Sequence, residues 1–256
     1  MGVIRQSPVD RPEVVFLDLG DTLVKPDPSW AEVYATAFDQ FDIAVAREDF
    51  ERAFADAFAE GQNDGPFEAS EEASYRRLKD LDSRIFALLG YPDLPDAFFR
   101  RVEEAFARAS SWWEFPDVLP ALDALLGAGI RLGVISNWSW QAPELLHDLE
   151  LARHFEALVI SARVGYLKPH RRIFEHALEV MKVEPARAMH VGDSIHADVE
   201  GARRAGMRAV LIDRSTHVHG RGSHRASLPP DVPVVADLGG LLDVVGIARA
   251  ATSAVS

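Results

Sequence analysis

The chain has 256 residues, of which 48% are hydrophobic and 26% are charged, and it contains no cysteine. This composition excludes a disordered chain or a collagen, and the lack of cysteine excludes disulfides, thiolate catalysis and iron–sulfur clusters. The net charge of −13 disfavours a nucleic acid as partner. No apolar run reaches the roughly 18 residues of a membrane span, and the N-terminus lacks an apolar signal segment. We therefore expect a cytoplasmic enzyme or binding protein without a membrane partner.

Short runs of branched apolar residues predict β-strands that are buried on both faces. In chain order these strands are expected at residues 14–18, 132–136, 158–161, 189–192 and 210–213, with a weaker one at 232–235. Helices are expected between the later strands, at residues 120–127, 142–151, 172–181 and 197–206. Strands that alternate with helices predict an α/β fold with a doubly wound, Rossmann-like parallel sheet.

A long stretch after the first strand, from about residue 30 to residue 110, shows only helical spacing. Phe50, Phe54 and Phe58 recur at intervals of four, and similar series at 78–88 and 98–106 follow breakers at 61–66 and 90–95. We expect three or four helices packed as a small bundle. The predicted domains are therefore a core of residues 1–25 and 116–256 and a helical insert of residues 26–115.

Charged and hydroxyl side chains follow four of the predicted strands. They are Asp18, Asp21 and Thr22, then Ser136 and Asn137, then Lys168, and finally Asp193 and Asp198. Because ligands bind beyond the carboxyl ends of the strands in an open parallel sheet, we expect these side chains to converge. Facing carboxylates require a hard cation such as Mg²⁺, and a lysine beside them favours an anionic substrate. The set predicts phosphoryl transfer through an aspartyl intermediate.

Four segments resemble, in order and spacing, the four motifs of the haloacid dehalogenase (HAD) superfamily of hydrolases. They are Asp-x-x-x-Thr at 18–22, the serine at 136, Lys-Pro at 168–169 and Gly-Asp-x-x-x-x-Asp at 192–198. The resemblance implies that Asp18 is the nucleophile, that Ser136 binds the phosphoryl group and that Lys168 neutralises charge. It further implies that Thr22 orders the loop at the substrate, where Asn137 is also expected.

The same resemblance implies a Mg²⁺ site and a cap. Asp18, the carbonyl of Gly20 and Asp193 are expected as metal ligands, with Asp198 supporting either the metal or Lys168. The helical insert has the position of the family's C1-type helical cap, which closes over the site and sets specificity. The expected activity is hydrolysis of a small phosphate monoester, with a small phosphorylated metabolite as partner and a monomer or homodimer as the working unit.

Position 20 departs from the family's pattern. Phosphatases of the family usually carry a second Asp two residues after the nucleophile, which protonates the leaving group and activates water, whereas this sequence has Gly20. Asp21 could take that role, or the enzyme could act on good leaving groups that need little protonation. The alternatives are the metal-free dehalogenase branch, the phosphonate-cleaving branch with Lys79 as its Schiff-base lysine, and a catalytically weak binder of a phosphate ligand. The pair Gly192-Asp193 favours the metal-dependent phosphatase.

Overall fold

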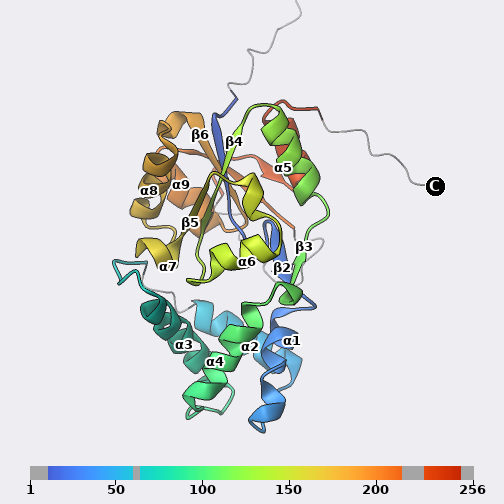
Figure 1. The fold of residues 1–256 in the computed structure, drawn as a ribbon, viewed down its shortest axis with the longest axis vertical. Helices are drawn as coiled ribbons and strands as arrows, with labels where there is room; N and C mark the ends of the chain where they lie inside the picture. Colours follow the sequence, from blue (N-terminus) through green and yellow to red (C-terminus); the bar gives the residue numbers. More distant parts are fainter. Residues whose placement is uncertain (1–10, 60–63, 215–227, 249–256) are drawn as a thin grey trace, which may run out of the picture.

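A computed structural model of the protein describes residues 11–59, 64–214 and 228–248. Six parallel strands form its central sheet in the spatial order β5-β4-β1-β6-β7-β8 (Figure 1). The strands are β1 (Val14–Leu17), β4 (Arg131–Ser136), β5 (Ala157–Ile160), β6 (Ala188–Gly192), β7 (Arg208–Ile212) and β8 (Val234–Val235). The chain starts in the middle of the sheet and winds outward to both edges, which confirms the predicted α/β class.

Helices cover both faces of this sheet. Alternate residues of β1 face opposite sides, so that Val15 packs with helices α5 (Val118–Gly127), α6 (Ala142–Asp148) and α10 (Leu238–Val244). Phe16 packs on the other side with α8 (Arg171–Met181) and α9 (Gly201–Arg204). The short helix α7 is Ser161–Val164, and 3₁₀ turns occur at Phe38–Gln40, Ala109–Ser111, Ala152–His154 and Pro185–Arg187. No helix in the described ranges combines the length and apolar character that a membrane crossing requires.

The helix expected at 197–206 is divided in the structure. Residues Ile195–Glu200 form a π-helical turn, and only Gly201–Arg204 are α-helical. The carbonyl of Ser194 accepts hydrogen bonds from the N–H groups of Asp198 (2.9 Å) and Val199 (3.2 Å), which widens the turn. Single π-turns of this kind are frequent at functional sites. Here the turn carries Asp198 directly beyond the end of β6.

The chain leaves and re-enters the core through an antiparallel ribbon. Strand β2 (Val24–Pro26) pairs with β3 (Trp112–Glu114), so that the segments in which the chain leaves and re-enters the core lie side by side. Between them lie α1 (Trp30–Ala35), α2 (Arg47–Ala59), α3 (Glu71–Leu88) and α4 (Asp96–Phe106), which we call the helical insert (Figure 1). The spacing predicts three or four helices here, and the described residues of this segment form the four α-helices α1 to α4. The exact domain boundaries stay a prediction.

Aromatic side chains fill the centre of the helical insert. Phe50, Phe86 and Phe98 are fully buried there, and Phe86 and Phe98 meet edge to face with ring centroids 4.7 Å apart. The helical spacing also placed Phe58 and Leu88 on the apolar faces, but they are 37% and 56% exposed. Both lie in the last turns of their helices.

A second connection joins the helical insert to the core. The N–H of Phe67 donates to the carbonyl of Gly165 at 3.0 Å, and the N–H of Leu167 donates to the carbonyl of Asp64 at 2.7 Å. We call these two backbone hydrogen bonds the 64–67 tether. It ties the segment before α3 to the loop that carries Lys168.

Candidate active site

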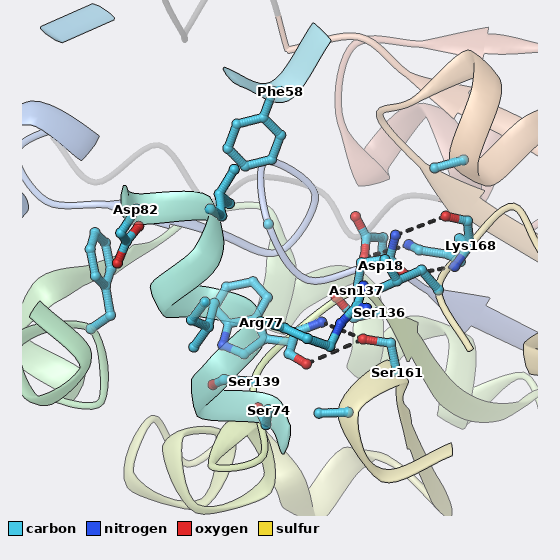
Figure 2. Close-up of a pocket in the computed structure, with 18 of the residues that line it drawn as sticks. Asp18, Phe58, Ser74, Arg77, Asp82, Ser136, Asn137, Ser139, Ser161 and Lys168 are labelled. Carbon is cyan, nitrogen blue, oxygen red and sulfur yellow. Dashed lines mark hydrogen bonds and ion pairs between the residues drawn. The ribbon is translucent and has the colours of Figure 1, made fainter. Parts of the chain in front are cut away.

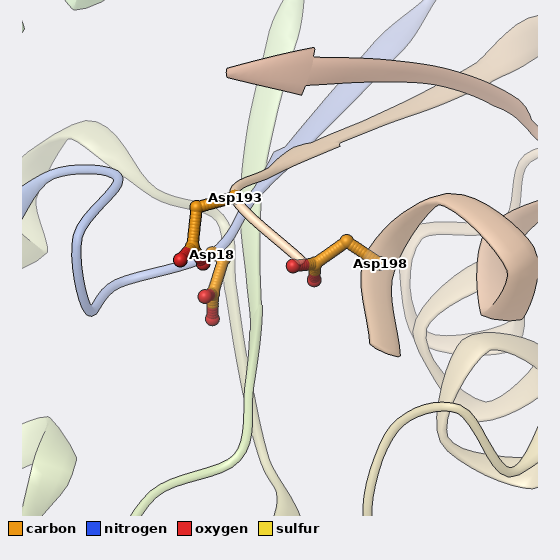
Figure 3. A group of neighbouring side chains, drawn as sticks. All are labelled: Asp18, Asp193 and Asp198. Atoms are coloured by element: carbon orange, nitrogen blue, oxygen red, sulfur yellow. The ribbon is translucent and has the colours of Figure 1, made fainter. Parts of the chain in front are cut away.

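Three neighbouring strands of the sheet bring the predicted residues together. Strands β4, β1 and β6 are adjacent, and Ser136, Asp18 and Asp193 stand at or directly beyond their carboxyl ends. One oxygen atom from each of Asp18, Asp193 and Asp198 lies within 4.8 Å of the other two (Figure 3). Residues that are far apart in the sequence thus form one acidic group at the edge predicted from the strand ends.

The ammonium group of Lys168 lies between two of these carboxylates. Its Nζ atom is 2.7 Å from Oδ1 of Asp18 and 2.6 Å from Oδ1 of Asp198, and all three side chains are buried. Burial alone would lower the pKa of Lys168, but the charges of Asp18 and Asp198 outweigh it, so the pKa lies above its usual value. Lys168 is therefore a fixed positive charge beside the carboxylate of Asp18.

Asp198 is held by donors on both oxygens. Its Oδ1 lies 2.6 Å from Lys168 Nζ and 2.8 Å from Nε2 of His190, and its Oδ2 accepts a hydrogen bond from the N–H of Ser194 at 2.9 Å. Burial would raise the pKa of Asp198, but the charge of Lys168 and the hydrogen bond from His190 hold it far below its usual value. Because both oxygens of Asp198 already accept hydrogen bonds, this side chain is better suited to position Lys168 than to bind a metal.

His190 also belongs to the site, through its hydrogen bond with Asp198, but the pattern of polar residues at the strand ends does not reveal this. It lies inside β6 and is buried, with its ring edge to face against Phe174. The only signal in the sequence is a polar residue within an otherwise apolar strand. Position 192 in the same strand requires glycine for a steric reason, because a Cβ atom there would overlap the carboxyl group of Asp198.

Two predicted residues act on the loops around the site. The side-chain amide of Asn137 donates to the carbonyl of Lys168 at 2.9 Å and accepts from its N–H at 2.7 Å, which fixes that loop. Thr22 is fully buried and is not among the described residues that line the cavity. Its carbonyl accepts two hydrogen bonds from Arg214, at 2.8 and 3.1 Å. This carbonyl belongs to the backbone, so the loop-ordering role of the Thr22 side chain and direct contact of either residue with a substrate stay predictions.

The position that lacks the usual second Asp is covered by an indole ring. A Cβ atom on Gly20 would stand 3.3 Å from Cζ3 of Trp138. Hydrogen bonds with the Ser161 hydroxyl hold the backbone of Trp138, at 3.1 Å for its N–H and 3.2 Å for its carbonyl. The ring of Trp138 also packs on that of Trp112, with the ring centroids 4.7 Å apart. Gly20 therefore fits a site in which Trp138 occupies the space beside it.

Asp21, the alternative to the missing Asp, lies in a turn. Its backbone has φ 55°, a left-handed conformation that Asp tolerates better than most residues, and its N–H donates to the carbonyl of Val24 at 2.8 Å. Asp21 is buried and lines the same cavity as Asp18. Its acid–base role stays a prediction.

A cavity of about 600 Å³ separates the strand ends from the helical insert. Asp18, Ser136 and Lys168 line it from the core, and Arg77 and Asp82 of α3 line it from the insert (Figure 2). This volume lies in the range of sites for small organic ligands.

The donor set fits Mg²⁺. Asp18 and Asp193 offer carboxylate oxygens within 4.8 Å of each other, and hard divalent cations take oxygen ligands. The ammonium group of Lys168 pairs with Asp18 and Asp198. A divalent cation bound by Asp18 and Asp193 would offset the charge of these carboxylates.

The sequence model of the haloacid dehalogenase-like hydrolases matches residues 12–206. The mouse haloacid dehalogenase-like hydrolase domain-containing protein 3 is 32% identical over 199 residues, which are 76% of this chain and 79% of that protein. A glyceraldehyde 3-phosphate phosphatase of Methanothermobacter thermautotrophicus is 36% identical over 135 residues, or 51% of this chain and 58% of that protein. The Bacillus subtilis HAD-hydrolase YfnB, solved with magnesium bound, superposes with a TM-score of 0.72 at 15% identity, covering 93% and 100% of the two chains.

Proposed function

The chain belongs to the haloacid dehalogenase-like hydrolases, and from this premise we propose that it is a Mg²⁺-dependent phosphatase of small phosphate monoesters. One observation carries the proposal: the Lys168 ammonium lies 2.7 Å from Asp18, beside a second acidic side chain from the neighbouring strand, Asp193. A carboxylate nucleophile, a fixed cation and a set of metal ligands are the parts that phosphoryl transfer through an aspartyl intermediate requires.

In the proposed reaction, a carboxylate oxygen of Asp18 attacks the phosphorus atom. The bond to the ester oxygen breaks, and the alcohol part leaves with the electron pair while Asp18 carries the phosphoryl group. Water then attacks phosphorus, which releases inorganic phosphate and restores the Asp18 carboxylate. Lys168 lies next to the attacking carboxylate and neutralises charge throughout, and Ser136 offers its hydroxyl to a phosphoryl oxygen.

Asp18, Asp193 and the carbonyl of Gly20 would hold the magnesium ion. When bound, the ion offsets the charge of the phosphoryl oxygens and of the carboxylate. Asp198 acts through Lys168, because its contacts with Lys168 and His190 fix the ammonium. The magnesium held by the solved HAD-hydrolase and the phosphatase among the relatives fit a metal-dependent phosphatase.

Gly20 sets the leaving group that the site can release. Without a carboxyl group at this position, and unless Asp21 supplies the proton, the alcohol oxygen leaves as an anion or takes its proton from water, and general acid help of about 10²–10⁴ in rate is missing. We infer that aryl and acyl phosphates, whose leaving groups are weak bases, react faster than alkyl phosphates. Trp138 beside Gly20 adds an aromatic surface where such a leaving group would lie.

The phosphonate-cleaving alternative would rely on Lys79, which lines the cavity from the helical insert. Lys79 forms an ion pair with Asp96 at 2.6 Å, and Tyr75 donates a hydrogen bond to the same carboxylate at 2.7 Å. This fits a structural lysine on the insert rather than a Schiff-base lysine. The metal-free dehalogenase does not account for the acidic cluster.

The helical insert is proposed as the cap, with core residues 1–25 and 116–256 and insert residues 26–115 as its domain limits. Its α3 supplies one wall of the cavity, so the insert would set specificity for the organic part of the substrate. A cytoplasmic location and a monomer or homodimer remain predictions.

The test compares 4-nitrophenyl phosphate with an alkyl phosphate such as glycerol 3-phosphate, each with Mg²⁺ and with EDTA. We expect turnover of the aryl ester, little turnover of the alkyl ester, and loss of both with EDTA. Turnover that resists EDTA would overturn the metal-dependent proposal. Absence of turnover with Mg²⁺ bound would favour a protein that only binds a phosphate ligand.

A further inference from the structure

A buried carboxyl group stands at the far end of the cavity from the reaction centre. Asp82 lies on α3, is only 5% exposed and lines the same cavity as Asp18. Figure 2 places Asp82 on one side of the cavity and Asp18 and Lys168 on the other. Asp82 does not belong to the acidic group of Asp18, Asp193 and Asp198, so it lies outside the phosphoryl-transfer centre.

Asp82 has little compensation for its burial. Tyr34 donates a hydrogen bond to its Oδ1 at 2.6 Å, and this is the one interaction that the described residues make with the carboxyl group. Burial raises the pKa of Asp82 to about 7, which the Tyr34 hydrogen bond only partly offsets. A buried carboxylate normally has a cation or several donors as partners.

The surroundings of Asp82 are aromatic. Rings of the helical insert line the same cavity, among them Tyr34, Phe54, Phe58, Phe99 and Phe106. Apolar walls with a few convergent polar groups are typical of sites that hold an organic ligand and fix its orientation, and Arg77, Lys79 and Glu103 line the same cavity as Asp82. The ring centroid of Tyr34 lies 4.9 Å from that of Phe50 and 5.0 Å from that of Phe106. The phenol that donates to Asp82 is therefore itself held in place.

From these contacts we propose that Asp82 binds an N–H group on the organic part of the substrate, either an ammonium or a ring N–H, while the phosphate lies at Asp18. Oδ1 is already bonded to Tyr34, so the ligand's N–H is assigned to Oδ2. The inference rests on the proposed phosphatase, because it describes the other end of the same substrate. The alternative is a structural Tyr34–Asp82 pair that no ligand touches.

Binding is measured by calorimetry with two pairs of aryl phosphonates, which the site cannot hydrolyse. The first pair is 4-(2-aminoethyl)phenylphosphonate and 4-propylphenylphosphonate, and the second is indol-5-ylphosphonate and 2-naphthylphosphonate. A hydrogen bond to a buried carboxylate should make the nitrogen-bearing member of at least one pair bind about tenfold tighter or more. Preference in the first pair identifies an ammonium and preference in the second a ring N–H. Equal binding within both pairs overturns the inference.

Asp82→Asn should reduce the preference of the wild-type protein to within about threefold of parity, since the amide no longer carries the charge. Asp80→Asn is the matched control, because Asp80 is an exposed carboxylate on the same helix, and it should keep the preference. Tyr34→Phe removes the hydrogen bond that lowers the pKa of Asp82, so it should weaken the preference at neutral pH, and circular dichroism of each variant checks that it is folded. An unchanged preference in a folded Asp82→Asn protein contradicts the inference.

The corresponding aryl phosphates separate this inference from the proposed function. If none of them is hydrolysed with Mg²⁺ while the phosphonate preference persists, the phosphatase proposal fails and Asp82 remains a ligand-recognition residue. If all of them are hydrolysed and the phosphonates show no preference, the phosphatase stands and the assignment of Asp82 fails.

Discussion

Restoring the missing acid tests how Gly20 and Trp138 depend on each other. Gly20→Asp places a Cβ atom 3.3 Å from Trp138 Cζ3, slightly inside the carbon–carbon optimum of about 3.5–4.0 Å. The indole must therefore shift by a few tenths of an ångström, which the backbone hydrogen bonds of Trp138 with Ser161 and the ring contact with Trp112 resist. We expect Gly20→Asp alone to raise alkyl phosphate turnover less than Gly20→Asp combined with Trp138→Ala.

In the double variant a general acid can reach the leaving group, so kcat/KM for glycerol 3-phosphate should rise by about 10²–10⁴. Steady-state release of inorganic phosphate measures the gain, with 4-nitrophenyl phosphate as reference because its leaving group needs little protonation. Gly20→Asn with Trp138→Ala is the matched control, since it has the same shape without an acid. If the Asp and Asn double variants behave alike on the alkyl ester, position 20 is not the acid–base position.

Three further outcomes are expected. Lys168→Met removes the ammonium beside the nucleophile and should lower turnover of 4-nitrophenyl phosphate by about 10²–10³ or more, and Lys168→Arg, with its larger planar group, should not restore it. Asp193→Asn should weaken Mg²⁺ binding in titration calorimetry, and Mg²⁺ should raise the Tm of the wild-type protein but not that of this variant. Because the pKa of Asp82 is about 7 in the folded protein, above its unfolded value of about 3.9, the native state holds the extra proton between these values. The free energy of unfolding should fall with rising pH, by at most about 3 kcal/mol between about pH 5 and about pH 8. Urea unfolding of Asp82→Asn should lack that part of the slope, and an identical slope in both proteins would refute it.

The sheet is the part of the fold that the sequence predicts best. The apolar runs at 14–18, 132–136 and 189–192 correspond to β1, β4 and β6. Strands that are buried on both faces have an unbroken apolar pattern, and the position of the polar side chains at their ends follows from the shared edge of a parallel sheet. That local pattern is why the acidic residues and Lys168 could be expected at one place.

Contacts between distant segments could not be predicted in the same way. The β2–β3 ribbon pairs Val24–Pro26 with Trp112–Glu114, and its partners are separated by the whole helical insert. The ring of Trp138 beside Gly20 depends on the path of the loop after β4, which no periodicity encodes. From the sequence alone, Asp82 is expected to face solvent on an amphipathic helix. Its burial follows only from the contact with Tyr34 of another helix.

The 64–67 tether would couple the opening of the cavity to the position of Lys168. If the helical insert swings about the β2–β3 ribbon, the tether must either break or pull on residues 165–167, directly before Lys168. Two backbone hydrogen bonds contribute about 0.5–1.5 kcal/mol each, enough to favour the closed arrangement and small enough to open thermally. A molecule that contacts both the helical insert and the core would therefore stabilise the closed arrangement and, with it, the position of the Lys168 ammonium group.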